Sequence, residues 1–334
     1  MFQDFKVFVK GVVVTALVLF GLDLILRTYH GYTYRDSWHA ISNAACDTNT
    51  TLTSAPSTAS SKVGKVFMQY GPVNPVYERA LSTHHPHNEK FGYPIFLLRS
   101  QTLPDYWSKT AYILKILIDE LEKPLESRLE WLFWFDSDIV LMNPNIPLEI
   151  FLPPNDKWSH IHVLISQDHR GLNNGCFGIR VHEYSVWLLS ATLSIKTYLP
   201  DIKLKIGDQS ALEYWLQSTQ FRNGTMHMPQ RWFNAYAGYR GRADYSDPLL
   251  PQRKFRPNSI KEGDILVHHA GHKQLRMARM EPWVAVAEQH LPQWELQLSQ
   301  TTYLQEIQKF WETEADKEYE RVTAFREVSG YHYL

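Results

Sequence analysis

The chain has little cysteine and no excess of charge of either sign. Its 334 residues include two cysteines, Cys46 and Cys176, which excludes a disulfide scaffold and leaves open one bridge or two free thiols. Lys and Arg total 34 against 35 for Asp and Glu, a formal net charge of -1, and the basic residues form no stripe. Such a chain has no field that attracts nucleic acid, so we exclude nucleic acid as a partner.

Long hydrophobic runs are also scarce, with one exception near the N-terminus. Residues 11–26, GVVVTALVLFGLDLIL, follow Lys6 and Lys10 and extend back through residues 7–9 to nearly the length of a thin bilayer. Asp23 would cost roughly 2.5 to 3.5 kcal/mol at the bilayer centre, but it lies near the far end of the run. We predict a cytoplasmic tail and signal-anchor helix over residues 1–30. A cleaved signal peptide and a buried amphipathic helix are the alternatives.

The next segment has the composition of a tether. Residues 43–62 are rich in Ser, Thr and Ala and have no apolar period, so we predict a flexible stem over 31–62. A lumenal folded domain is predicted over 63–334, since the composition changes there and 44% hydrophobic residues suffice for a large core. N-x-S/T sequons at Asn49 and Asn223 agree with a lumenal side.

Short apolar runs alternate with amphipathic segments along the predicted domain. They predict strands beginning at residue 63 and over 131–135, 162–166, 176–181 and 264–268, and helices over 109–123, 182–193, 211–216 and 302–325. This alternation is typical of an α/β fold with a largely parallel central sheet.

The most informative stretch is WLFWFDSD, residues 131–138. Its five apolar residues suit a central strand covered on both faces, and the carboxyl end of such a strand is where open α/β sheets bind ligands. Asp136 and Asp138 lie two apart and face one point in extended chain. Because two carboxylates repel at short range, this pattern predicts a bound divalent metal, Mg²⁺ or Mn²⁺.

Two enzyme chemistries use an apolar strand that ends in D-x-D. Phosphatases of the haloacid-dehalogenase type have D-x-D-x-[TV], which Asp136, Asp138 and Val140 match, and metal-dependent glycosyltransferases hold a sugar-nucleotide diphosphate through the metal. The phosphatase needs a later G-D-x-x-x-D motif. Neither Asp208 nor Asp264, each preceded by glycine, has the second aspartate. The glycosyltransferase interpretation is therefore favoured.

Five further blocks resemble one family. QDHRGLNNGCFGIR, VHEYSVWLL, GDQSALEYWL, MPQRWFNAY and GDILVHHAG follow EWLFWFDSDIVLMNP in the order seen in glycosyltransferase family 34. That family contains fungal α-1,2-galactosyltransferases and Golgi α-1,6-mannosyltransferase subunits, with plant xyloglucan xylosyltransferases as relatives. The resemblance runs from about residue 63 to 285 and implies a GT-A-like nucleotide-sugar-binding fold.

The resemblance also implies the metal and catalytic residues. Asp136, Asp138 and His268 match the family's metal ligands, and imidazole beside carboxylates suits Mn²⁺, with Mg²⁺ as the alternative. His269 and His272 replace an aromatic residue and a cysteine of the family pattern, which leaves the histidine assignment ambiguous. Asp208 and Gln209 match a pair beside the transferred sugar, although Asp208 would also serve as a helix N-cap.

Substrate-binding residues follow from the same match. The resemblance places Ser137 near the ribose and Lys273 near the leaving diphosphate, with the remaining candidates around the donor: Lys109, Gln167, Asp168, Asn173, Gly175 and Gly271. Lys109 and Lys273 could instead be solvated surface charges. Trp232 and Phe233 either stack on acceptor sugars or belong to the core.

The resemblance implies a retaining hexosyltransferase of the Golgi membrane, with single-pass type II topology. Its donor would be UDP-galactose or GDP-mannose, its acceptor a glycan, and its product α-linked. Complexes with other Golgi glycosyltransferases occur in the family. A low-activity subunit of a mannosyltransferase complex is therefore the alternative to an enzyme that is active alone.

Overall fold

The computed structural model describes residues 61–237, 257–271 and 274–328. The predicted anchor and all but the last two residues of the predicted stem lie outside these ranges. Within them, no helix is long and apolar enough to cross a membrane.

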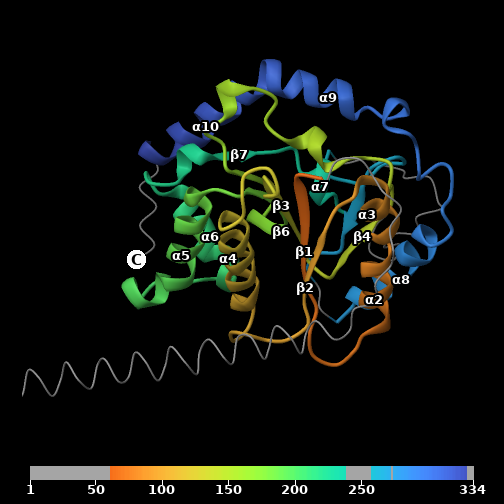
Figure 1. Cartoon of the computed structure of the whole chain (residues 1–334), viewed down its shortest axis with the longest axis horizontal. Helices are drawn as coiled ribbons and strands as arrows, with labels where there is room; N and C mark the ends of the chain where they lie inside the picture. Colours follow the sequence, from red (N-terminus) through yellow and green to blue (C-terminus); the bar gives the residue numbers. More distant parts are fainter. Residues whose placement is uncertain (1–60, 238–256, 272–273, 329–334) are drawn as a thin grey trace, which may run out of the picture. The chain divides into compact units, whose positions relative to one another are not determined.

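A six-stranded sheet forms the centre of the described domain (Figure 1). Its order is β2-β1-β3-β6-β5-β7. The strands are β1 (Val63–Met68), β2 (Ile95–Leu98), β3 (Trp131–Phe135), β5 (Val163–Asp168), β6 (Gly171–Arg180) and β7 (Thr225–His227). Only β6 among these runs against its neighbours, because it pairs antiparallel with both β3 and β5. The predicted α/β fold with a largely parallel sheet is confirmed.

Strand β3 is buried on both faces, as its sequence predicts. Trp131, Phe133 and Phe135 join the core on one face, while Leu132 and Trp134 join the core on the other. Burial of each large apolar side chain stabilises the fold by roughly 1.5–3 kcal/mol. The strand is therefore a rigid base for the residues that follow it.

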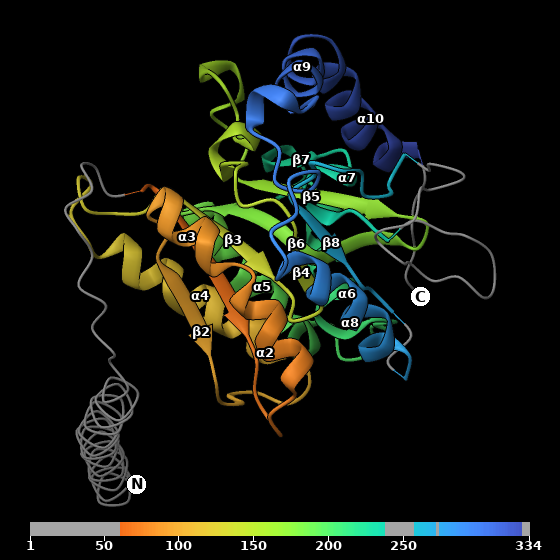
Figure 2. The same cartoon turned by 90° about the vertical axis from the view of Figure 1, so that its right-hand side faces the viewer.

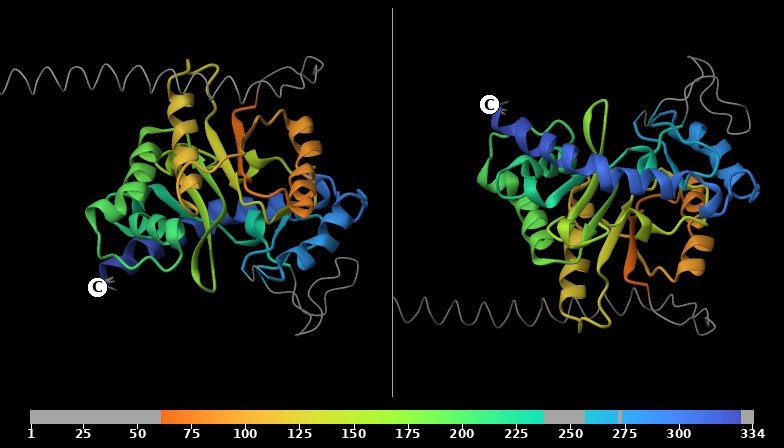
Figure 3. Two further views of the ribbon diagram at one scale, coloured as in Figure 1. Left: turned by 90° about the horizontal axis from the view of Figure 1, so that it is seen from below. Right: turned by 90° about the horizontal axis from the view of Figure 1, so that it is seen from above.

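Helices cover both faces of the sheet. Helices α4 (Trp107–Leu121), α5 (Glu183–Tyr198) and α6 (Gly207–Gln217) lie together on one side, and α2 (Pro75–Ser82), α3 (His85–Phe91) and α8 (Arg276–Ala287) lie on the other (Figures 1 and 3). The predicted helices over 109–123, 182–193 and 211–216 correspond to α4, α5 and α6. Strand β6 begins at Gly171, five residues before the predicted strand 176–181.

A separate two-stranded sheet positions the site. Strand β4 (Ile139–Leu141) pairs antiparallel with β8 (Leu266–His268), and His268 lies opposite Ile139. Because β4 begins one residue after Asp138, this register brings a histidine that is 130 positions later in the chain next to the D-x-D motif.

The C-terminal segment packs along the β7 edge (Figure 2). The helix predicted over 302–325 is divided into α9 (Tyr303–Lys309), a π-helical turn (Phe310–Glu314) and α10 (Ala315–Val328). The π turn buries the neighbouring side chains of Phe310 and Trp311 together. Short elements complete the described chain: α7 (Arg231–Asn234) and 3₁₀ turns at Leu148–Phe151, Asp156–Trp158, Arg222–Gly224 and Leu298–Gln300.

Two aromatic residues of α7 belong to the core. Trp232 and Phe233 are 2% and 0% exposed and contact the ring of Phe151. The acceptor-stacking interpretation of these two residues is therefore wrong, since neither ring is accessible to a sugar.

Candidate active site

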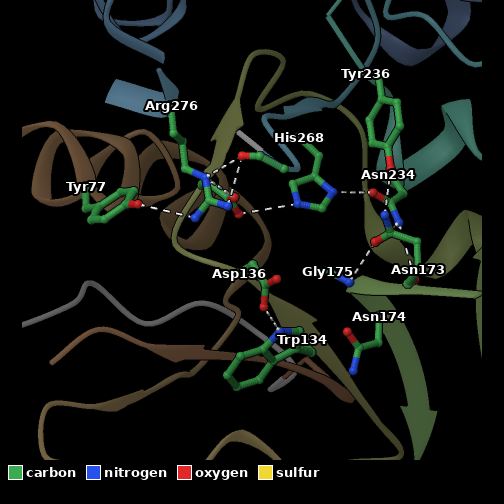
Figure 4. A network of polar contacts seen from close by, with 12 residues as sticks. Tyr77, Trp134, Asp136, Asn173, Asn174, Gly175, Asn234, Tyr236, His268 and Arg276 are labelled. Carbon is green, nitrogen blue, oxygen red and sulfur yellow. Dashed lines mark hydrogen bonds and ion pairs between the residues drawn. The ribbon is translucent and has the colours of Figure 1, made fainter. Parts of the chain in front are cut away.

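The D-x-D carboxylates and one histidine meet directly after β3. Asp136, Asp138 and His268 each offer a ligand atom, and these atoms lie within 4.8 Å of one another. Strand β3 ends at Phe135, and the Asp136 backbone N–H donates to the Gly175 carbonyl of β6 at 2.8 Å. The local chain path therefore fixes the motif at the carboxyl end of the central strand (Figure 4).

Asp138 is the buried carboxylate of the pair. Its Oδ1 lies 3.3 Å from His268 Nε2, and its Oδ2 lies 2.9 Å from Arg276 Nε. Burial acts to raise the pKa of Asp138, but His268 and Arg276 outweigh burial and hold this pKa below its ordinary value. Asp138 is therefore an anion in a buried position, and Arg276 is a site residue that the sequence did not indicate.

Asp136 is more open, with 35% of its side chain exposed. Its Oδ1 accepts from Trp134 Nε1 at 2.7 Å and from Lys109 Nζ at 3.1 Å. Lys109 lies in the first turn of α4 and is itself buried, with its ammonium 5.0 Å from the centre of the Trp134 ring. Lys109 is thus part of the site, and the alternative of a solvated surface lysine is wrong.

The orientation of His268 is set by Asn234. His268 Nδ1 donates to Asn234 Oδ1 at 2.6 Å, because Asn234 Nδ2 faces two acceptors, Ser166 Oγ at 2.9 Å and Asn173 Oδ1 at 3.1 Å. Asn234 is fully buried, so its amide is held in one orientation. Nε2 of His268 is left to face the carboxylates, as a metal ligand requires.

A hydrogen-bond network continues from Asn234 to the end of β5. Asn173 Nδ2 donates to Asp168 Oδ2 at 3.0 Å and to the Tyr236 hydroxyl at 2.6 Å, and Tyr236 donates to the same carboxylate oxygen. Burial and the hydrogen bond to Asp168 raise the pKa of Tyr236, which keeps the hydroxyl a donor. Asp168 therefore lies at one end of this network, and Figure 4 shows the part that joins Tyr236, Asn173 and Asn234 to His268.

Gly175 is needed for the approach of this histidine. A Cβ on Gly175 would lie 2.2 Å from His268 Cε1 and 2.8 Å from His268 Nε2, closer than real Cβ contacts. The family resemblance gave this glycine a place beside the donor. The structure adds a different physical reason, which is that the imidazole ring lies against the strand at this position.

Asp208 and Gln209 approach the cluster from α6. Asp208 Oδ2 accepts from Asn174 Nδ2 at 2.9 Å and lies 3.9 Å from Lys109 Nζ, while Gln209 Oε1 accepts from the Asn174 backbone N–H at 3.3 Å. Burial raises the pKa of Asp208, and Lys109 partly opposes this. The N-cap of α6 is Ile206, so the alternative role of Asp208 as N-cap is wrong.

A cavity of about 280 Å³ opens beside His268. Its lining includes Asp168, Gly271 and three arginines, Arg170, Arg276 and Arg279. Gly271 has a φ of 81° and its carbonyl accepts from Arg276 Nη2 at 3.2 Å. Three guanidinium groups around one cavity favour an anionic ligand such as a diphosphate.

One predicted substrate-binding residue, Gln167, lies away from the cavity beside His268. Gln167 lines a different cavity, with Met228 and residues of the C-terminal helices, because successive side chains of β5 point to opposite faces. Ser137 lies half-buried in the turn between the two acids. His269 is buried against Trp283, and burial lowers the pKa of its imidazole to about 3. Lys273 and His272 lie outside the described residues.

The residues present fit a divalent metal ion. Two carboxylates and an imidazole are hard and borderline ligands that suit Mn²⁺, and the second nitrogen of His268 has the hydrogen-bonded partner that metal-ligating histidines usually have. The nearby thiol, Cys176, is free and fully buried on β6, and burial raises its pKa, so it is not a ligand of this kind.

Solved structures resemble this chain weakly. A glycosyltransferase involved in glycosylation of the major capsid of PBCV-1 is 13% identical, with 66% of this chain and 98% of that chain covered and a TM-score of 0.49. Galactosyltransferase LgtC, in complex with donor and acceptor sugar analogues, is 12% identical, with coverage of 68% and 95% and a TM-score of 0.42. The fold is therefore assigned from this chain's own strand order.

Sequence relatives are more informative. A probable alpha-1,2-galactosyltransferase gmh1 of Schizosaccharomyces pombe is 26% identical over 55% of this chain and 58% of the relative, and an alpha-1,2-galactosyltransferase of the same yeast is 22% identical over 60% and 57%. The chain thus spans less than two thirds of the relatives it matches. The model of the galactosyl transferase GMA12/MNN10 family matches residues 151–277, which include Asp168, Asp208 and His268. The resemblance to glycosyltransferase family 34 is thus confirmed over residues 151–277, the part of the chain that the family model matches.

Proposed function

We propose that this protein is a metal-dependent retaining glycosyltransferase that moves a hexose from a nucleotide sugar to a glycan in α linkage. The observation that carries the proposal is the convergence of Asp136, Asp138 and His268 beside an arginine-lined cavity in a chain of this family. A divalent cation held there would neutralise charge on the departing diphosphate. Mn²⁺ is our proposed cation, with Mg²⁺ as the alternative.

The charged and polar residues around the proposed metal site form two groups. Lys109 and Arg276 bring fixed positive charge to the side where negative charge develops on the leaving group. Asp208 and Gln209, held by Asn174, supply a carboxylate and an amide oxygen for the positive charge that develops on the sugar. The burial of Lys109 and Asp208 strengthens both effects, because water screens them little.

The stereochemical proposal follows from the family. The acceptor oxygen attacks the face of the sugar carbon from which the diphosphate departs, and a diphosphate oxygen accepts the hydroxyl proton. The new C–O bond then has the configuration of the broken one, and the donor's α linkage is retained. Asp208 in this scheme stabilises charge without forming a covalent intermediate.

The donor, the acceptor and the location are proposed on family grounds. The donor is UDP-galactose or GDP-mannose, and the acceptor is a mannose-containing glycan. Residues 1–30 anchor the chain in the Golgi membrane with type II topology, and the domain from residue 63 is lumenal.

The test is product formation by the full chain. We would incubate it with each donor, an α-linked mannose disaccharide and either MnCl₂ or EDTA, and determine the anomeric configuration of the product by NMR. We expect an α-linked trisaccharide from one donor only when metal is present. A β-linked product would refute the retaining mechanism, and donor binding without transfer would favour a subunit role in a mannosyltransferase complex.

A further inference from the structure

Both acids of the D-x-D motif already have a cationic partner. Asp136 faces the ammonium of Lys109 at 3.1 Å, and Asp138 faces the guanidinium of Arg276 at 2.9 Å. Arg276 balances the charge of Asp138, whereas Lys109 is shared between Asp136 and Asp208, whose Oδ2 lies 3.9 Å from the ammonium. A divalent cation that approaches Asp138 without a nucleotide therefore meets a carboxylate whose charge is already compensated.

Arg276 is placed where it can serve either of two anions. It is the first residue of α8 and lines the arginine-rich cavity, while its Nε contacts the buried Asp138. Its other contacts are weaker: the Gly271 carbonyl accepts from Nε and Nη2 at 3.3 and 3.2 Å, and Nη1 lies 3.5 Å from the Tyr77 hydroxyl (Figure 4). The Asp138 contact is thus the strongest one, and a guanidinium fork on the cavity wall also matches a diphosphate.

We propose that Arg276 is a switch of the donor site: it neutralises Asp138 in the metal-free protein and moves to the nucleotide diphosphate when metal and donor bind. This inference rests on the proposed function and assigns the order of binding. Metal and donor bind cooperatively, because the diphosphate supplies the negative charge that the metal needs and gives Arg276 a second partner. Metal without nucleotide has to displace Arg276 and binds weakly.

The test uses the full chain and two titrations followed by calorimetry, first MnCl₂ alone and then UDP or GDP in the presence of MnCl₂. In R276Q, we expect Mn²⁺ alone to bind about tenfold or more tightly than in the wild type, because the competing cation is gone. Nucleotide binding in the presence of Mn²⁺ should weaken by about tenfold, since the diphosphate loses a charged fork. Disruption of the fold by itself would weaken both affinities, so the opposite signs are specific to a switch.

A matched control is R170Q, which removes the same charge from the rim of the same cavity, at an exposed position in the β5–β6 turn. R170Q should leave the affinity for Mn²⁺ alone within about twofold of the wild type. Equal or weaker Mn²⁺ binding by R276Q overturns the inference but leaves the proposed metal site intact. If neither the wild type nor R276Q bound Mn²⁺, with or without nucleotide, both the inference about Arg276 and the proposed metal-dependent function would be wrong.

Discussion

The close contact between Gly175 and His268 gives the sharpest single-residue prediction. In Gly175→Ala, the new methyl group would lie 2.2 Å from His268 Cε1, whereas ordinary contacts begin near 3.4 Å. The imidazole ring would have to move by about 1.2 Å. It is held on its other side by Asn234 at 2.6 Å, so it cannot move without leaving that partner or Asp138.

Metal sites tolerate displacements of only about 0.2 Å in ligand distance. We therefore expect Gly175→Ala to lower Mn²⁺ affinity by about 10–100-fold, the usual range when a ligand loses its orientation. The overpacked strand should also cost about 1–3 kcal/mol of unfolding free energy. Mn²⁺ affinity is measured by calorimetry in the presence of UDP or GDP, and stability by urea unfolding without metal.

Gly178 of the same strand provides the control. A Cβ on Gly178 would lie 3.1 Å from Phe133 Cζ, in the core and away from the metal ligands. Gly178→Ala should therefore destabilise the fold and leave Mn²⁺ affinity unchanged. If Gly175→Ala binds Mn²⁺ as the wild type does, or if both variants lose affinity equally, the contact between Gly175 and His268 does not control metal binding.

Three further predictions concern single positions. Asn234→Ala removes the acceptor for His268 Nδ1, and Mn²⁺ titration should show about a 10–100-fold loss of affinity; unchanged affinity would mean that another group orients the ring. Burial lowers the pKa of Lys65 far below its value in the unfolded chain. When the pH falls below about 10.4, Lys65 becomes protonated in the unfolded chain but stays neutral in the folded chain, so the free energy of unfolding decreases. Lys65→Met removes this penalty, so its gain in unfolding free energy over the wild type should shrink as the pH of urea unfolding rises from 7 toward 10. The control Lys115→Met, at an exposed position, should show no such trend. A pH-independent difference for Lys65→Met would mean that the buried Lys65 amine is not neutral. Gln167→Ala should leave donor affinity within about twofold of the wild type, because Gln167 lines a separate cavity, and a large loss in a donor titration would put it at the donor site after all.

Local patterns predicted the elements that position the site. Strand β3 and the helices before and after it follow from runs of apolar residues, which depend on burial alone. The π turn at residues 310–314 was not predictable, because a helical period carries no signal for one inserted residue. The early start of β6 at Gly171 depends on its pairing with β5, which is a tertiary effect.

The residues of the site were likewise only partly predictable from the sequence. The D-x-D motif was recognisable because its acids are two apart after an apolar strand. Asn234 and Arg276 were missed because each acts through a partner far away in the sequence, His268 and Asp138 respectively. Gln167 lines a separate cavity because adjacent strand residues alternate, and the motif alone does not say which of residues 167 and 168 faces the cavity beside His268.

The D-x-D cluster is proposed to bind a sugar nucleotide through a metal ion. The most direct measurement is calorimetric titration of UDP-galactose and GDP-mannose into the full chain, with MnCl₂ and with EDTA, for the wild type and Asp138→Asn. We expect one donor to bind the wild type only with Mn²⁺ present, and its affinity to fall at least tenfold in Asp138→Asn, which keeps the shape but loses the charge. Equal donor binding in EDTA, or undiminished binding by Asp138→Asn, would show that the donor does not bind through a metal ion held by Asp138.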